Sequence, residues 1–166
     1  MRTIIKKYIS ILKGNVKHLY DGKINISKNW YGNSYGGFFV ATQYLNEESV
    51  VLSFGIGEDI SFDTEIINKH NCIVYGFDPT PKSVNWINNK KDKISNLFKF
   101  YEYGIAEKTG FVNFFLPNNT KNVSGSLINQ INVNKDRKVE VLMKSITDIC
   151  TELKLQKIDV LKMDIV

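Results

Sequence analysis

From residue 49 onward, short runs of apolar residues alternate with amphipathic stretches. The apolar runs cover residues 49–54, 72–77, 98–103, 111–116, 139–143 and 158–165. The first of them has apolar residues on both faces, which is typical of a strand buried in a parallel sheet. The stretches between several of the runs repeat apolar residues every three or four positions, which predicts helices. The alternation predicts an α/β fold, in which helices flank both faces of a Rossmann-like, mostly parallel sheet.

Polar residues and proline indicate where the predicted helices begin and end. Asp59, Ser61 and Asp63 are available to cap the first turn of the helix that follows the first strand. Asn71 is placed to end that helix, because asparagine tolerates the left-handed conformation common at helix ends. Pro81 suits the first position of the next helix.

The first 48 residues follow a different pattern. Apolar residues at positions 4, 5, 8, 9 and 12 share one side of a predicted amphipathic helix. Residues 20–37 are rich in glycine, asparagine and aromatic residues, and we expect them to form an ordered loop. We therefore divide the chain into an N-terminal segment, 1–48, and an α/β domain, 49–166.

The composition favours a globular protein of a reducing, cytoplasmic compartment. With 166 residues, 43% of them hydrophobic, the chain can bury a core without disulfides or metal ions. Cys72 and Cys150 stand alone, with no histidine at ligand spacing, so no metal site is expected. The apolar runs fall far short of the ~20 residues of a membrane-spanning helix, so we expect no membrane span.

The positive charge does not point to a nucleic-acid partner. The formal net charge is +5, but only Arg2 and Arg137 among the 22 basic residues are arginines. Arginine is the residue that recognises bases and phosphates through paired hydrogen bonds, whereas scattered lysines are typical of a solvated surface. We therefore expect no specific nucleic-acid binding.

The candidate chemistry lies between the first two strands. Gly55 and Gly57 follow the first strand, and Asp78 ends the next one, 21 residues after Gly57. Glycines at a strand end let the backbone approach a ligand closely, and an acid at the neighbouring strand tip can accept hydrogen bonds from the two hydroxyls of a ribose. Such a turn can also carry its glycines for structural reasons alone.

The acidic residues beside these glycines favour one adenosine ligand over another. A dinucleotide site of the GxGxxG type needs a small third residue, and Ile60 stands there. Glu58 and Asp59 would also repel a pyrophosphate, which counts against an NAD-type oxidoreductase, the alternative enzyme class. A cationic sulfonium with an amino-acid tail has the opposite preference. The turn therefore favours S-adenosyl-L-methionine as the cofactor.

Several motifs together resemble the FkbM-type family of S-adenosylmethionine-dependent methyltransferases. In order they are YGGF (35–38), SVVLSFGIGEDISFD (49–63), GFDPTP (76–81), GIA (104–106), SGS (124–126) and IDVLKMD (158–164). The resemblance spans roughly residues 30–165. Its most specific parts are the GxGEDxSFD stretch and the LKMD strand. It implies a class I methyltransferase fold and O-methylation of a hydroxyl on a sugar, a polyketide or a similar small-molecule or glycan acceptor.

The resemblance also implies roles for individual residues at the cofactor. Gly55, Gly57 and Glu58 would line its methionine end, and Asp78 would hold the ribose hydroxyls. Ile105, in the GIA turn, would lie beside the adenine.

Asp164 is the candidate catalytic base, because it ends the last strand near the expected position of the methyl group. We expect Lys162 and Asp164 to face opposite sides of that strand.

The end of the chain departs from the family pattern. In the family the last strand continues as Asp-Ile-Glu-Gly, whereas here Ile165 is followed by Val166 and the terminus. We therefore expect a methyltransferase truncated after its fourth core strand, which could be inactive. A non-catalytic binding or assembly module is the second alternative function. The outer edge of strand 158–165 would then be unpaired and could form a homodimer.

Overall fold

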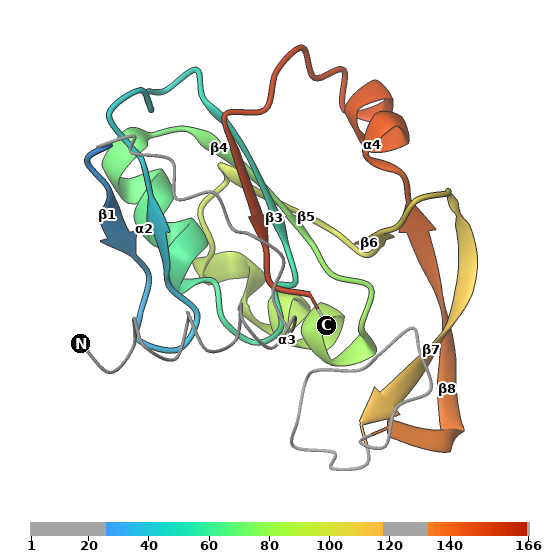
Figure 1. Ribbon diagram of the computed structural model, residues 1–166. Coiled ribbons are helices and arrows are strands. Elements are labelled where there is room, and N and C mark those ends of the chain that lie inside the picture. Colours follow the sequence, from blue (N-terminus) through green and yellow to red (C-terminus); the bar gives the residue numbers. More distant parts are fainter. Residues whose placement is uncertain (1–25, 118–132, 166) are drawn as a thin grey trace, which may run out of the picture.

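A four-stranded parallel sheet forms the centre of the computed structural model, which describes residues 26–117 and 133–165 (Figure 1). Its strands, in spatial order, are β5 (Phe98–Tyr101), β4 (Ile73–Phe77), β3 (Val50–Phe54) and β9 (Val160–Met163). Each neighbouring pair is parallel. The helical elements are α2 (Ser61–His70), α3 (Pro81–Lys90), η1 (Lys91–Lys93) and α4 (Ile146–Glu152). The predicted α/β fold with a mostly parallel sheet is confirmed.

Helices cover both faces of this sheet, as predicted. Side chains alternate between the faces of a strand, so Val51 and Leu52 point in opposite directions. Val51 packs in one cluster with Ile66 of α2 and with α3 residues. Leu52 packs in the other with Ile149 of α4. Ile66 and Ile149 are completely buried, and truncating either to alanine would cost about 2–5 kcal/mol.

The start of α2 differs from the prediction in one respect. Asp59 Oδ1 accepts a hydrogen bond from Ser61 N (2.7 Å), so this residue does satisfy a donor of the first turn. Asp63 does not cap the helix, because it lies on the same helix face as Ile66 and Ile67 and is 1% exposed. Asn71 ends the helix with φ 52°, as predicted.

The predicted loop 20–37 contains a strand instead. β1 (Asn29–Tyr31) pairs antiparallel with β2 (Phe38–Val40). Tyr31 is 2% exposed and its hydroxyl lies 2.8 Å from Nε2 of His70 at the end of α2. The strand forms because it can bury this tyrosine against the helix, a gain that local composition does not reveal. The predicted helix over residues 4–12 lies outside the described residues, and the division of the chain at residue 48 stays a prediction.

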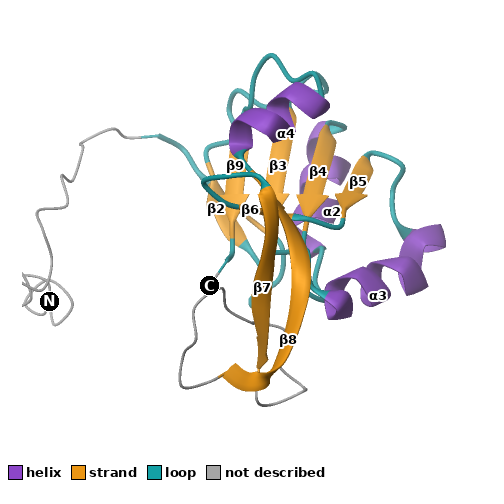
Figure 2. Cartoon of the chain, turned by 90° about the vertical axis from the view of Figure 1, so that its right-hand side faces the viewer, coloured by secondary structure: helices purple, strands orange, loops and turns teal. Residues whose placement is uncertain are grey.

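A second sheet contains the apolar runs 111–116 and 139–143. β5 ends at Tyr101, and the chain then forms β6 (Gly104–Ile105). β6 pairs with β8 (Val133–Lys144), which in turn pairs antiparallel with β7 (Gly110–Pro117). In Figure 2 the β7–β8 pair extends away from the parallel sheet. The parallel sheet therefore has four strands in the described residues, and the strand predicted over 98–103 ends at Tyr101.

β9 is an edge strand, paired within the described residues with β3 alone. Leu161, Met163 and Ile165 are 48%, 46% and 51% exposed on one side of it. The described ranges contain no helix long and apolar enough to cross a membrane.

Candidate functional site

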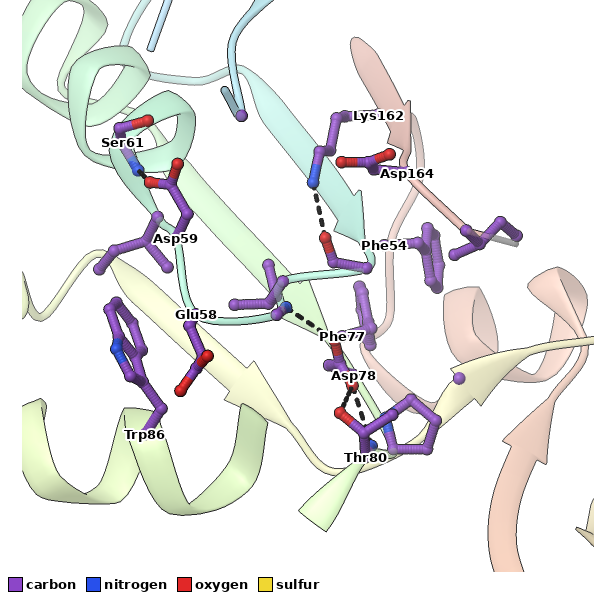
Figure 3. Close-up of a pocket in the computed structure, with 18 of the residues that line it drawn as sticks. Phe54, Glu58, Asp59, Ser61, Phe77, Asp78, Thr80, Trp86, Lys162 and Asp164 are labelled. Carbon is purple, nitrogen blue, oxygen red and sulfur yellow. Dashed lines mark hydrogen bonds between the residues drawn. The ribbon is translucent and has the colours of Figure 1, made fainter. Parts of the chain in front are cut away.

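A cavity of about 1200 Å³ lies at the carboxyl ends of β3, β4 and β9 (Figure 3). Ligands of open α/β sheets bind at this edge, where the strands end in loops. Every site residue predicted from the sequence lines the cavity: Gly55, Gly57, Glu58, Asp78, Ile105 and Asp164. The fold thus brings together residues separated by more than 100 positions, while their roles toward a ligand stay predictions.

The turn after β3 depends on its two glycines. Gly55 and Gly57 have φ of +79° and +58°, in the left-handed region that L side chains avoid. A Cβ on Gly55 would also lie 2.0 Å from the backbone oxygen of Asp164. The turn is fixed from both sides, because Gly55 N donates to Phe77 O (3.0 Å) and Asp164 N donates to Phe54 O (3.0 Å). Neighbouring strands therefore determine where this turn lies.

Asp78 joins the two loops that border the cavity. Its Oδ2 accepts from Gly57 N (2.8 Å), and its Oδ1 accepts from Thr80 N (2.9 Å) and Thr80 Oγ1 (2.6 Å). A carboxylate has about four acceptor positions, so roughly one remains, on Oδ2. The side chain is 4% exposed. Asp78 thus has a structural role that the sequence did not reveal, and it can offer a ligand fewer hydrogen bonds than expected.

The acidic pair in the turn is less available than the sequence suggested. Glu58 forms an ion pair with Lys82 of α3, with Oε2 and Nζ 2.9 Å apart. Asp59 Oδ2 accepts from Asn33 Nδ2 (2.7 Å), in addition to its bond with Ser61. Partial burial raises the pKa of Asp59, but these hydrogen bonds and the charge of Lys162 outweigh it and hold the pKa below its ordinary value. Both acids of the turn therefore already have partners within the protein.

One rim of the cavity comes from the turn between β1 and β2. Gly32 N donates to Glu65 Oε2 (2.7 Å), and Asn33 N donates to Ser61 Oγ (3.0 Å), which tie this turn to α2. Asn33, Tyr35 and Gly36 line the cavity. Sequence reasoning did not propose these residues as a site, although the YGGF motif includes two of them. Tyr35 is 88% exposed.

Part of the cavity lining is apolar. It contains side chains from several elements, namely Phe77, Pro79, Ile105, Phe114 and Met143. Met143 Sδ lies 2.7 Å from where a Cβ on Gly104 would be, so a side chain at that position would displace the methionine. Sequence reasoning missed Phe114 and Met143 because they come from the β7–β8 pair, whose position depends on distant contacts. It also missed Trp86 of α3.

Lys162 and Asp164 both line the cavity, so the expectation that they face opposite sides is wrong. Residues two apart in a strand share a face. Lys162 is 7% exposed and donates from Nζ to Gly55 O (2.8 Å), as Figure 3 shows. Asp164 is exposed.

A buried polar group lies behind Lys162, between the sheet and α2. Ser53 is the register partner of Lys162, and Asp63 of α2 lies near both. Ser53 Oγ and both carboxylate oxygens of Asp63 have no hydrogen-bond partner among the described residues. Burial raises the pKa of Asp63, and the Ser53 hydroxyl and the Lys162 charge oppose the rise. In the described ranges no three His, Cys, Asp or Glu residues are arranged to hold a metal ion.

The comparison with protein families returned one relevant finding. The family model described as the methyltransferase FkbM domain matches residues 49–165. No curated protein and no solved structure matched the chain. The match covers well over half of the chain and contains the whole parallel sheet with its glycine turn. The chain therefore belongs to the FkbM methyltransferase domain family.

Proposed function

We propose that this chain binds S-adenosyl-L-methionine in the cavity and takes part in transferring its methyl group to a hydroxyl of a sugar or similar small acceptor. The observation that carries the proposal is the convergence of the glycine turn, Asp78 and Asp164 on one cavity, in a chain of the FkbM methyltransferase domain family.

The cavity has the size and polarity that this cofactor requires. Its volume of about 1200 Å³ exceeds the ~300–1,000 Å³ of ordinary small-molecule sites, which leaves room for part of an acceptor. Its lining includes the charged side chains Asp59 and Lys162, and Lys162 contacts the carbonyl of Gly55. The lining also includes the apolar side chains Ile105 and Phe114. An amino acid joined to an adenosine likewise combines a charged part with a flat, largely apolar one.

In the proposed reaction the protein mainly positions the reactants. The bound cofactor supplies an activated methyl group on a sulfonium. Gly55 and Gly57 let the backbone approach the amino-acid end, Asp78 accepts a hydrogen bond from a ribose hydroxyl, and Ile105 packs beside the adenine. Asp164 is exposed to the cavity and removes the proton of the acceptor hydroxyl. Alignment of an activated carbon with a hydroxyl can supply much of the rate enhancement.

Titration calorimetry with S-adenosylhomocysteine and NAD tests the choice of cofactor. We expect tighter binding of S-adenosylhomocysteine, since Asp59 and Ile60 disfavour a pyrophosphate at the helix start. Tighter binding of NAD would favour the oxidoreductase alternative, and absence of binding to either would contradict the proposal.

The transfer step is tested with a radiolabelled methyl donor and a panel of sugar acceptors. Asp164→Asn should abolish most of the incorporation while leaving S-adenosylhomocysteine binding unchanged. Asp159→Asn, on the loop before β9 and outside the lining of the cavity, is the matched control. If the chain binds S-adenosylhomocysteine but methylates no acceptor, the binding-module alternative is favoured over transfer by this chain.

A further inference from the structure

Lys162 is a buried cation whose hydrogen-bonding capacity is largely unused. Its side chain comes from β9, beside Ser53 on the face that α2 covers. It is 7% exposed, yet it lines the cavity beside the glycine turn. An ammonium has three N–H donors, and the one hydrogen bond found for it among the described residues goes to Gly55 O (2.8 Å).

The nearby acids do not use the remaining donors. Within the described ranges, no carboxylate oxygen lies within 4.0 Å of Nζ of Lys162. The two carboxylate oxygens of Asp59 accept hydrogen bonds from Ser61 N and Asn33 Nδ2. Asp63 lies behind the lysine without a hydrogen bond. A buried ammonium with free N–H donors favours an acceptor that enters the cavity.

The cavity offers few other cations to an anionic group. Lys90 is the other lysine in its lining, and no arginine or histidine is present among the described lining residues. Nζ of Lys90 lies 4.0 Å from the ring centre of Trp86, on the α3 side. Lys162 lies beside the glycine turn, and the proposed function assigns this turn to the amino-acid end of the cofactor.

We propose that Lys162 binds the carboxylate at the amino-acid end of the methyl donor. The Gly55 carbonyl holds the ammonium in place, and the other N–H groups donate to the two carboxylate oxygens. The inference rests on the proposed function and deepens it, because it assigns recognition of the amino-acid tail to one side chain. It gives the buried lysine a ligand partner in addition to its bond with the turn.

The test combines a change in the protein with a matched change in the ligand. Calorimetry is run with S-adenosylhomocysteine and with its decarboxylated analogue, which keeps the adenosine, the thioether and the amine. Lys162→Met should weaken S-adenosylhomocysteine binding ten- to a hundredfold, the range for lost hydrogen bonds between charged groups, and change binding of the analogue less than twofold. Lys99→Met, an exposed lysine on β5, is the control and should change neither affinity.

The outcomes separate this inference from the proposed function. Equal losses for both ligands would mean that Lys162 only supports the turn, and unchanged affinities would mean that it has no role; either result overturns the inference. If the wild-type protein binds neither ligand, both the proposed function and this inference are wrong. If Lys162→Met does not fold, the two affinities of the wild-type protein still test the inference. The analogue must bind at least tenfold more weakly than S-adenosylhomocysteine.

Discussion

Replacing Asp78 separates the two roles that its carboxylate can have. The side chain is 4% exposed and accepts hydrogen bonds from Gly57 N, Thr80 N and Thr80 Oγ1. Asp78→Ala removes all of these acceptors and disconnects the loop after β3 from the loop after β4. A hydrogen bond to a charged group contributes about 1.5–3 kcal/mol, and bonds within one network are not additive. Water in the cavity can also reach Gly57 N in the variant.

We therefore expect Asp78→Ala to lower the free energy of unfolding by about 2–4 kcal/mol, a large part of the ~5–15 kcal/mol of an ordinary domain. The affinity for S-adenosylhomocysteine should fall by a further 1.5–3 kcal/mol, about the contribution of one charged hydrogen bond, if the spare position on Oδ2 accepts a ribose hydroxyl. Thr80→Val is the matched control. It removes a hydrogen bond to Oδ1, so it should cost stability but leave the affinity unchanged.

Urea unfolding followed by circular dichroism measures the stability, and calorimetry below the unfolding transition measures the affinity. A loss of stability without a loss of affinity would show that Asp78 only joins the two loops, which refutes its role at the ribose. If neither quantity changes, the hydrogen bonds to Gly57 and Thr80 do not contribute, and the energetic reasoning itself is wrong.

Three further predictions concern strain, pH and the edge strand. Gly55→Ala should lower the free energy of unfolding by more than the about 1–2 kcal/mol that a positive φ alone costs, because its Cβ would also meet the Asp164 backbone; a loss within that range in urea would contradict this. The raised pKa of Asp63 means that the folded state holds its proton more tightly, so stability falls as the pH rises above the ordinary value of 3.8. Asp63→Asn should remove that fall in a pH series of urea unfolding, and lower stability of the variant at pH 7 would indicate a stabilising ion pair instead. The chain should self-associate in sedimentation experiments through β9, and Leu161→Lys should weaken the association; a wild-type monomer at high concentration would rule it out.

Much of the parallel sheet could be predicted because its signals are local. A strand buried on both faces needs an apolar run, and a strand-to-helix turn with positive φ needs glycine, so β3 and Gly55 are visible in the sequence. The second sheet could not be placed in the same way. The runs that form β7 and β8 have strand periodicity, but periodicity does not tell which strand lies next to which.

Two buried charged residues show where sequence reasoning reached a wrong result despite a usable signal. Asp63 has the residue type of a helix cap, yet its spacing from Ile66 and Ile67 puts it on the buried face of α2. Lys162 lies on the same side of the chain as Asp164, because side chains two positions apart in an extended strand point the same way. In both cases position along the element gave the correct side. The contact of Lys162 with Gly55 is different, because it spans 107 positions and leaves no local pattern.

The candidate site and the exposed sheet edge belong to the same strand, so their properties are coupled. β9 supplies Lys162 to the carbonyl of Gly55 and the backbone of Asp164 to Phe54, and its other side carries the exposed Leu161. A strand bonded to one neighbour opens more easily than one held on both sides. Each opening of β9 would remove both contacts from the glycine turn. A partner that pairs with the edge of β9 that is open among the described residues would therefore also hold the turn in place.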